Sequence, residues 1–157
     1  MRWTDYDSKV CSVARTADVI GDRWTVLVLR DLFNGIRRFD DLTAHLGIAR
    51  DILSRRLSAL VDAGVVERQP YQEAGHRTRF EYRLTDAGAE LRPVMVAMAQ
   101  WGDAHRAGAD GPPTVVLHRA CGARVHAALV CDRGHDIIDG AQVVMRPTAA
   151  ARLIAHV

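Results

Sequence analysis

Several features are scarce or missing in this sequence, and each absence excludes a class of protein. The three cysteines, Cys11, Cys121 and Cys131, are too few and odd in number for a structural disulfide framework. No uninterrupted apolar run is long enough to cross a bilayer, and the first ten residues lack the apolar segment of a signal peptide. We therefore expect a cytoplasmic protein with no membrane partner.

Signatures of catalysis are missing as well. The sequence contains no Gly-rich phosphate loop, no nucleophile elbow and no paired carboxylate motif. His45 and His105 fall on expected helices and are interpreted as partly exposed surface residues. Asp40 and Asp41 are interpreted as a charge pair at the start of a helix. The sequence does not predict an enzyme.

Lysine is almost absent, so the positive charge comes from arginine. The 21 Lys and Arg residues include a single lysine, Lys9, and the net charge is only +2. The arginines gather between residues 37 and 79, whereas acidic residues concentrate before them. A local basic surface is the electrostatic footprint of a DNA-binding face. A generally Arg-rich composition is the alternative explanation.

Helical periodicity and capping signals organise the first half of the chain. They predict helices at residues 11–20, at 23–33 with Asp22 as N-cap, from Phe39 to Gly47, and from about Ala49 to Gly64. Two alternating segments, at residues 65–68 and 80–84, then flank a polar tract with Gly75 at its tip.

Helix, tight turn, helix and β-hairpin together form a winged helix-turn-helix, which places one helix in the DNA major groove. We expect a mainly α fold with a small β-hairpin wing (α+β). On the fourth helix, Leu53, Leu57 and Leu60 form a buried seam and leave Asp51, Ser54, Arg55 and Ser58 on the far face. Arg, Ser and Asp suit phosphates and base edges. The predicted DNA-binding residues are Arg37, Arg38, Arg50, Asp51, Ser54, Arg55, Arg56, Ser58, His76, Arg77 and Arg79.

A fifth helix is expected after Thr85, its N-cap. An apolar stripe from Leu91 to Trp101 runs along it, and Pro93 is expected to kink its early part. The stripe fits a contact between two copies of the chain, and burial within one copy is the open alternative. Residues 1–107 are thus expected to form the DNA-binding and dimerisation domain.

The end of the chain has a different residue pattern, which predicts a linker and short strands in place of long helices. Residues 108–113 are a linker by composition, and residues 114–157 are a small β-rich extension. Strands are expected at residues 115–117, 125–130 and 143–145, and a brief helix at residues 148–155.

Two Cys/His pairs in the extension have the spacing of a zinc ribbon. The candidate ligands are His118, Cys121, Cys131 and His135, with His126 as an alternative. Gly134 occupies the position where a ribbon normally has its fourth cysteine. A structural zinc-ribbon-like site and a degenerate ribbon without metal both fit this pattern.

The motifs in combination resemble the HxlR-type winged helix-turn-helix transcriptional regulators, within the MarR-like superfamily. The resemblance spans about residues 11–102 and rests on segments such as Arg30-Asp31-Leu32, Leu53-Ser54-Arg55-Arg56-Leu57, Tyr82-Arg83-Leu84-Thr85 and Trp101-Gly102. It implies a homodimer that binds double-stranded DNA at a near-palindromic operator. It does not distinguish an activator from a repressor, and we expect a repressor. It further implies a recognition helix at residues 49–63 and a wing at residues 72–79.

Cys11 is a candidate sensor residue under the same resemblance. Some HxlR-type regulators detect quinones, electrophiles or oxidants through a cysteine near the first helix, and Cys11 matches that position. Helix N–H groups, Lys9 and Arg15 would favour its thiolate. The alternative is a small residue that only fills space. Two other functions remain open for the chain as a whole: a winged-helix module that binds proteins without binding DNA, and a regulator that binds a small-molecule effector.

Overall fold

The computed structural model describes residues 2–72, 75 and 77–154. Its contacts group the chain into two units, Met1–Ala89 with Pro147–Val157, and Glu90–Arg146. The division into domains at residues 1–107, 108–113 and 114–157 stays a prediction. No helix in the described residues has the length and apolarity needed to cross a membrane.

Four helices form the centre of the first unit: α1 (Ser12–Ile20), α2 (Arg23–Phe33), α3 (Phe39–Leu46) and α4 (Arg50–Asp62). Two short 3-10 helices, η1 (Trp3–Asp5) and η2 (Ser8–Val10), precede them. The expected cap of α2 is confirmed, because the Asp22 carboxylate accepts the N–H groups of Trp24 and Thr25 at 2.9 and 3.2 Å. Gly47 ends α3 at φ +61°, in the left-handed region that glycine enters without a Cβ clash.

The core lies where α2, α3, α4 and the start of the hairpin meet. Leu53, Leu57 and Leu60 are buried on one face of α4, as the apolar seam predicts. Ile48, in the turn between α3 and α4, is buried as well. Burial of such side chains is the main stabilising contribution in a small domain. The other buried apolar residues are Ile20, Val28, Leu29, Leu32, Leu42, Val65 and Val66.

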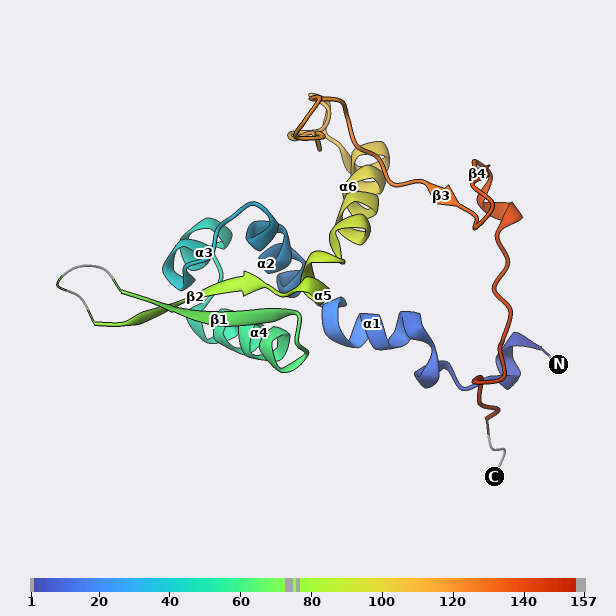
Figure 1. Ribbon diagram of the computed structural model, residues 1–157, viewed down its shortest axis with the longest axis horizontal. Coiled ribbons are helices and arrows are strands. Elements are labelled where there is room, and N and C mark those ends of the chain that lie inside the picture. Colours follow the sequence, from blue (N-terminus) through green and yellow to red (C-terminus); the bar gives the residue numbers. More distant parts are fainter. Residues whose placement is uncertain (1, 73–74, 76, 155–157) are drawn as a thin grey trace. The chain divides into compact units, whose positions relative to one another are not determined.

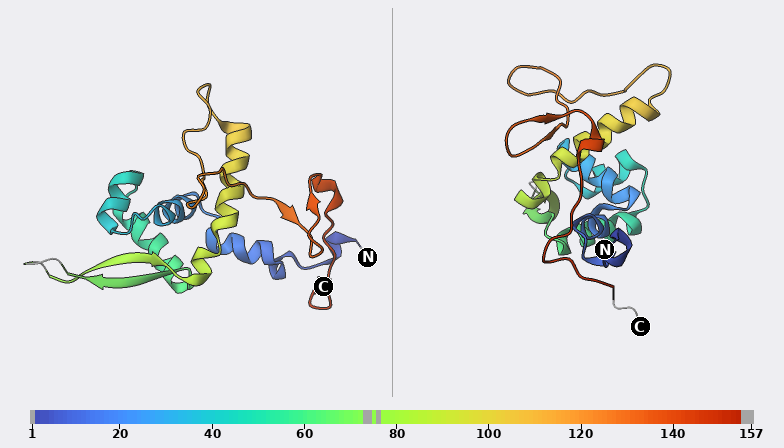
Figure 2. Two further views of the ribbon diagram at one scale, coloured as in Figure 1. Left: turned by 45° about the horizontal axis from the view of Figure 1, so that its top comes forward. Right: turned by 90° about the vertical axis from the view of Figure 1, so that its right-hand side faces the viewer.

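The wing is an antiparallel hairpin of β1 (Val66–Tyr71) and β2 (Arg79–Leu84). Its register runs from Val66 opposite Leu84 to Tyr71 opposite Arg79. The two strands extend beyond the ends of α3 and α4 in Figure 1 and in the left-hand view of Figure 2. A single bridge between Arg38 and Glu81 connects the segment before α3 to β2. The expected winged helix-turn-helix is therefore present.

The predicted fifth helix is two helices, α5 (Asp86–Ala89) and α6 (Arg92–Arg106). Pro93 lies in the first turn of α6, where its missing N–H costs nothing, and it prevents a continuous helix through residues 90 and 91. The Thr85 cap is confirmed, since the Thr85 Oγ1 accepts the Gly88 N–H at 3.1 Å. Gly88 lies so close to the hairpin that a Cβ there would come within 2.1 Å of the Val65 carbonyl oxygen.

The extension contains much less regular structure than its sequence predicts. Its strands are β3 (Leu129–Val130) and β4 (Asp136–Ile137), which pair antiparallel, and η3 (Gly140–Gln142) follows. A bridge between Leu117 and Arg124 closes an earlier turn. Residues 143–145 do not form a strand, and residues 148–154 do not form a helix. The apolar run Val143-Val144-Met145 predicts a strand, but no neighbouring strand in the described residues supplies hydrogen-bond partners.

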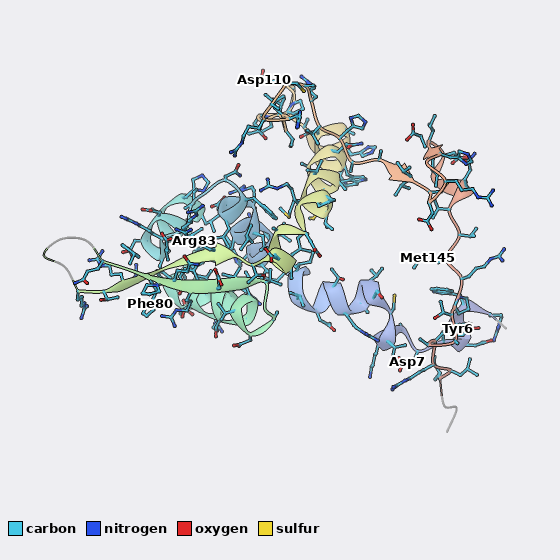
Figure 3. The ribbon with its side chains drawn as sticks, viewed as in Figure 1. Tyr6, Asp7, Phe80, Arg83, Asp110 and Met145 are labelled. Atoms are coloured by element: carbon cyan, nitrogen blue, oxygen red, sulfur yellow. The ribbon has the colours of Figure 1, made fainter. Side chains whose placement is uncertain are left out.

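Residues 152–154 pair instead with the N-terminal segment of the same unit. The Asp7 N–H donates to the Arg152 carbonyl at 2.8 Å, and the Ile154 N–H donates to the Asp5 carbonyl at 2.9 Å. Tyr6 forms a bridge with Leu153 between these bonds. Figure 3 labels Tyr6 and Asp7 on this segment. The backbone of residues 152–154 is thus extended, because an extended chain satisfies this pairing.

Candidate nucleic-acid interface

The outward face of α4 carries the predicted recognition residues. Asp51, Ser54, Arg55 and Ser58 are all exposed, on the side opposite the buried leucines. Arg55 Nη2 lies 3.2 Å from Asp51 Oδ2, one helical turn earlier, and the Arg55 side chain is 73% exposed. An ion pair this exposed contributes little to stability. The Arg55 guanidinium can therefore exchange Asp51 for a phosphate or a guanine edge at small cost.

Arg50 connects the two helices of the helix-turn-helix. Its guanidinium donates to Asp40 of α3 at 2.7 Å and lies over the Phe39 ring, 4.8 Å from the ring centre. Both partners stand in the first turn of α3, and Arg50 stands in the first turn of α4. The contact is exposed, so Arg50 remains open to a phosphate while it orients the start of α4.

Arg56 lies on the flank of α4, facing the start of α2. Its Nε atom is 3.0 Å from Asp22 Oδ1, but the N–H is not aligned for a hydrogen bond. The same Asp22 oxygen already accepts two N–H groups of α2. The structure therefore gives Arg56 a bracing contact within the chain, and a direct role in DNA binding stays a prediction.

The base of the wing brings Arg37 and Arg38 beside the hairpin. The Tyr82 N–H donates to the Arg37 carbonyl at 2.9 Å, and the Arg38 guanidinium lies 4.6 Å from the centre of the Tyr71 ring. Both arginines are exposed. Since their backbone is fixed against β2, their side chains are presented next to the wing.

Arg77 and Arg79 are exposed at the distal part of the wing, and His76 lies outside the described residues. Arg68 was not predicted to take part, although its guanidinium lies 4.2 Å from the centre of the Phe80 ring. Figure 3 labels Phe80 on β2, together with Arg83. The diagonal register of the hairpin brings Arg68 and Phe80 together, and the spacing along the sequence does not show this. Arg68 adds a further cation to the wing.

Asp31, near the end of α2, is a buried carboxylate that is not among the predicted site residues. Its side chain is 1% exposed. Arg30 Nε donates to Oδ1 at 2.9 Å, and His45 Nδ1 of α3 lies 2.6 Å from Oδ2. His45 is partly exposed, as expected, but it is also a specific partner of Asp31. Fourteen residues separate the two, so no local motif indicates the pair.

Cys11 is the N-cap residue of α1 and is half-buried. Its side chain makes no capping hydrogen bond. The Arg15 guanidinium, expected to favour the thiolate, donates instead to the Val10 carbonyl at 3.0 Å. The structure thus confirms the place of Cys11 at a helix N-terminus and leaves its reactivity a prediction.

The four candidate zinc ligands lie in two separate turns. His118 Nδ1 is 3.1 Å from Cys121 Sγ in the first turn, whereas the Cys131 N–H donates to the His135 carbonyl in the second. Among the described residues, which include all four and His126, no three Cys, His, Asp or Glu side chains form a group that could hold a metal. Each turn is closed by its own backbone bonds, and the two do not pair. The residues do not fit the predicted zinc ribbon, so we derive no role for zinc.

Cys131 differs from an ordinary thiol in one respect. Backbone hydrogen bonds from Arg133 and His135 lower the pKa of the Cys131 thiol, because they stabilise the thiolate.

An apolar cavity of about 380 Å³ lies within the second unit. Gln100, Trp101 and His105 of α6 and residues 127–129 line it. His105 is the only acid–base group of this lining, which gives no pair of groups for acid–base catalysis.

Comparison with known proteins identifies the family of this chain. The family profile described as HxlR-like helix-turn-helix matches residues 19–109, more than half of the chain. The chain belongs to the HxlR-like helix-turn-helix family. This confirms the resemblance inferred from the motifs. The HTH-type transcriptional regulator Rv3095 of Mycobacterium tuberculosis is 40% identical over 136 residues, covering 87% of this chain and 85% of that protein.

Two solved structures superimpose on this chain over more than half of its length. PA1607, proposed to be a transcription factor, superimposes with a TM-score of 0.77 at 36% identity, covering 89% of this chain and 97% of that one. The redox regulator HypR in its reduced form superimposes with a TM-score of 0.55 at 28% identity, covering 61% and 94%. The HxlR-like chain is a DNA-binding transcriptional regulator of the winged helix-turn-helix type, and its named relatives are regulators, not enzymes.

Proposed function

We propose that this HxlR-like protein is a homodimeric, sequence-specific repressor that binds a near-palindromic operator in the cytoplasm. The observation that supports this most strongly is the outward face of α4, where Ser54, Arg55 and Ser58 stand exposed above a buried leucine seam. A helix with this division of faces fits the major groove while its other face stays in the core. The arginines of the wing supply sequence-independent contacts to phosphates.

Dimerisation is proposed from the exposed apolar side chains of α6. Val94, Met98 and Trp101 are all exposed, and Trp101 is 56% exposed. No residue of α6 is buried. A stripe of large apolar side chains on one helix is typical of a protein–protein interface. Pairing of two copies would present two recognition helices to the two halves of an operator.

Charge reversal at Arg55 tests DNA binding. Arg55→Glu is expected to weaken binding to a DNA fragment selected by the wild-type protein from a random pool by roughly a hundredfold, because it loses an attractive contact and adds repulsion. Fluorescence anisotropy over a salt series measures the affinity, and the slope against log salt gives the number of neutralised phosphates. Sedimentation of the same samples checks that each variant remains dimeric.

Arg119→Glu is the matched control, since Arg119 is exposed in the extension and undergoes the same change of charge. Equal, small losses for both variants would indicate non-specific attraction. Unchanged binding in Arg55→Glu would point to a winged-helix module that recognises protein instead.

Regulation by oxidants is proposed for Cys11. The structural similarity to a redox regulator and the position of Cys11 at the start of α1 support the idea. A peroxide would oxidise the thiol to sulfenic acid and itself be reduced to water or alcohol. Cys11→Ser is expected to bind operator DNA normally but to keep it bound when peroxide is added, as measured by gel shift. DNA release from Cys11→Ser at the wild-type peroxide concentration would rule Cys11 out as the sensor.

A further inference from the structure

The buried Asp31 carboxylate is placed where the scaffold helix α2 meets the first helix of the helix-turn-helix. Burial of an ionised carboxylate is costly unless other groups compensate its charge. Arg30 supplies one compensating group from the same helix, at Oδ1, through Nε at 2.9 Å and Nη2 at 2.8 Å. His45 supplies the other from α3, at Oδ2. The polar partner of Asp31 Oδ2 therefore comes from α3.

The contact is a hydrogen bond in the tautomer that carries a proton on His45 Nδ1, because an ionised carboxylate only accepts. In that tautomer His45 Nδ1 donates to Asp31 Oδ2. The bond is charge-assisted, and its 2.6 Å length agrees with a strong interaction. His45 stands in the last turn of α3, two residues before Gly47 and the turn to α4.

A second polar contact transmits the position of α3 to α4. Asp40, in the first turn of α3, accepts a hydrogen bond from Arg50 at the start of α4. The end of α3 thus contacts α2, the beginning of α3 contacts the beginning of α4, and the buried turn residue Ile48 connects the two helices. Ser54 and Arg55, which are proposed to contact DNA, lie about one turn after Arg50 on the same helix.

We propose that Asp31 is a positioning residue for DNA binding, which acts through His45 to set the placement of α3 and, through Asp40 and Arg50, of the recognition helix α4. The inference rests on the proposed DNA-binding function. Asp31 itself is buried and does not reach DNA. Its contribution is geometric: without the Asp31–His45 bond, α3 and α4 take up a wider range of positions against α2, and fewer of these match the groove.

Substitutions at His45 separate this role from ordinary packing or charge. His45→Ala removes the donor, yet alanine is the better helix former, so a loss of affinity does not come from helix propensity. His45→Asn keeps a side-chain N–H close to the position of Nδ1, and asparagine and histidine have similar helix propensities. We expect about tenfold weaker binding to the selected DNA fragment for His45→Ala. His45→Asn should recover most of that loss.

The companion variant Asp31→Asn separates a geometric effect on DNA affinity from an electrostatic one, because the two effects have opposite directions. Removal of a negative charge near DNA favours binding by long-range electrostatics. A roughly tenfold loss for Asp31→Asn would therefore oppose the electrostatic effect and indicate lost geometry. Asp62→Asn, at the exposed end of α4, is the matched control and should bind at least as tightly as wild type.

All affinities are measured on the full chain, across a salt series, below the unfolding temperature of each variant. If Asp31→Asn does not fold, the half-exposed position 45 still decides the question. Unchanged affinity in His45→Ala would overturn the proposal. So would equal losses in His45→Ala and His45→Asn with a shallower salt slope, because that result makes His45 a direct phosphate contact. If Arg55→Glu binds DNA normally, the proposed function fails, and this outcome is distinct from a failure at position 45.

Discussion

The winged-helix core and the extension of this chain contain the same kinds of apolar residue, but these are buried in the core and exposed in the extension. In the core, leucines and valines from α2, α3, α4 and β1 are removed from water together. From residue 114 to residue 154, the described part of the extension, no residue is fully buried, and Val115, Leu117, Leu129 and Ile138 are exposed. Apolar content alone therefore does not create a core. The core exists because periodic spacing directs the apolar side chains of several helices toward one volume.

The largest contrast between the two regions is expected from the same substitution made in each. Leu57→Ala should lower the free energy of unfolding by about 2–5 kcal/mol, because it leaves a cavity in a packed interior. Leu117→Ala, on an exposed side chain of the extension, should change it by less than about 0.5 kcal/mol. Urea unfolding followed by circular dichroism measures both. Comparable losses would mean that the extension is buried against another surface in solution.

Removal of a helix cap compares the core and the extension again, with a smaller expected change in the free energy of unfolding. Asp22→Ala removes the N-cap of α2 and the Arg56 ion pair, and should destabilise the protein by about 1 kcal/mol. Asp139→Ala removes an equivalent cap, where the Asp139 carboxylate accepts the Ala141 N–H at 2.9 Å in the extension. It should leave the cooperative unfolding midpoint unchanged, since no packed core depends on that turn. A shift of the unfolding midpoint in Asp139→Ala would show that the extension unfolds cooperatively with the core.

The smallest expected effect concerns a thiol of the extension. The pKa of Cys131 is lowered, so its thiolate persists as the pH falls below the pKa of an ordinary cysteine. In a chain that carries Cys11→Ser and Cys121→Ser, alkylation of Cys131 is expected to keep its rate to lower pH than alkylation of free cysteine. The alkylation rate followed by mass spectrometry from pH 6 to 9 measures this. A rate profile equal to that of free cysteine would contradict the proposed effect of the backbone N–H groups.

The sequence was sufficient for the helices and the wing because their signals are local. The Asp22 cap, Gly47 and the α4 leucine seam each act within about one turn of the chain, and each has the expected outcome. The break between α5 and α6 is predicted only in part, because Pro93 predicts a kink in one continuous helix, whereas the structure has two helices. A proline in the first turn of a helix marks a beginning.

Other features depend on partners distant in sequence. The Asp31–His45 bond joins two helices, and the contact of Arg56 with Asp22 spans thirty-four positions, so neither follows from spacing. The apolar segments of the extension predict strands, but a local segment does not show which strand will pair with it. Strands need neighbours, and residues 143–145 have none in the described sheets.

The close approach of Gly88 to Val65 makes position 88 far less tolerant of substitution than the outward face of α4. Any side chain at residue 88 would overlap a carbonyl oxygen of the backbone, which no rotamer can avoid. In a saturation mutagenesis library selected for folding, the outward face of α4 should therefore accept many residues, whereas position 88 should accept glycine alone. Recognition of a new operator could then be selected on α4 while the joint between α5 and the wing stays as it is.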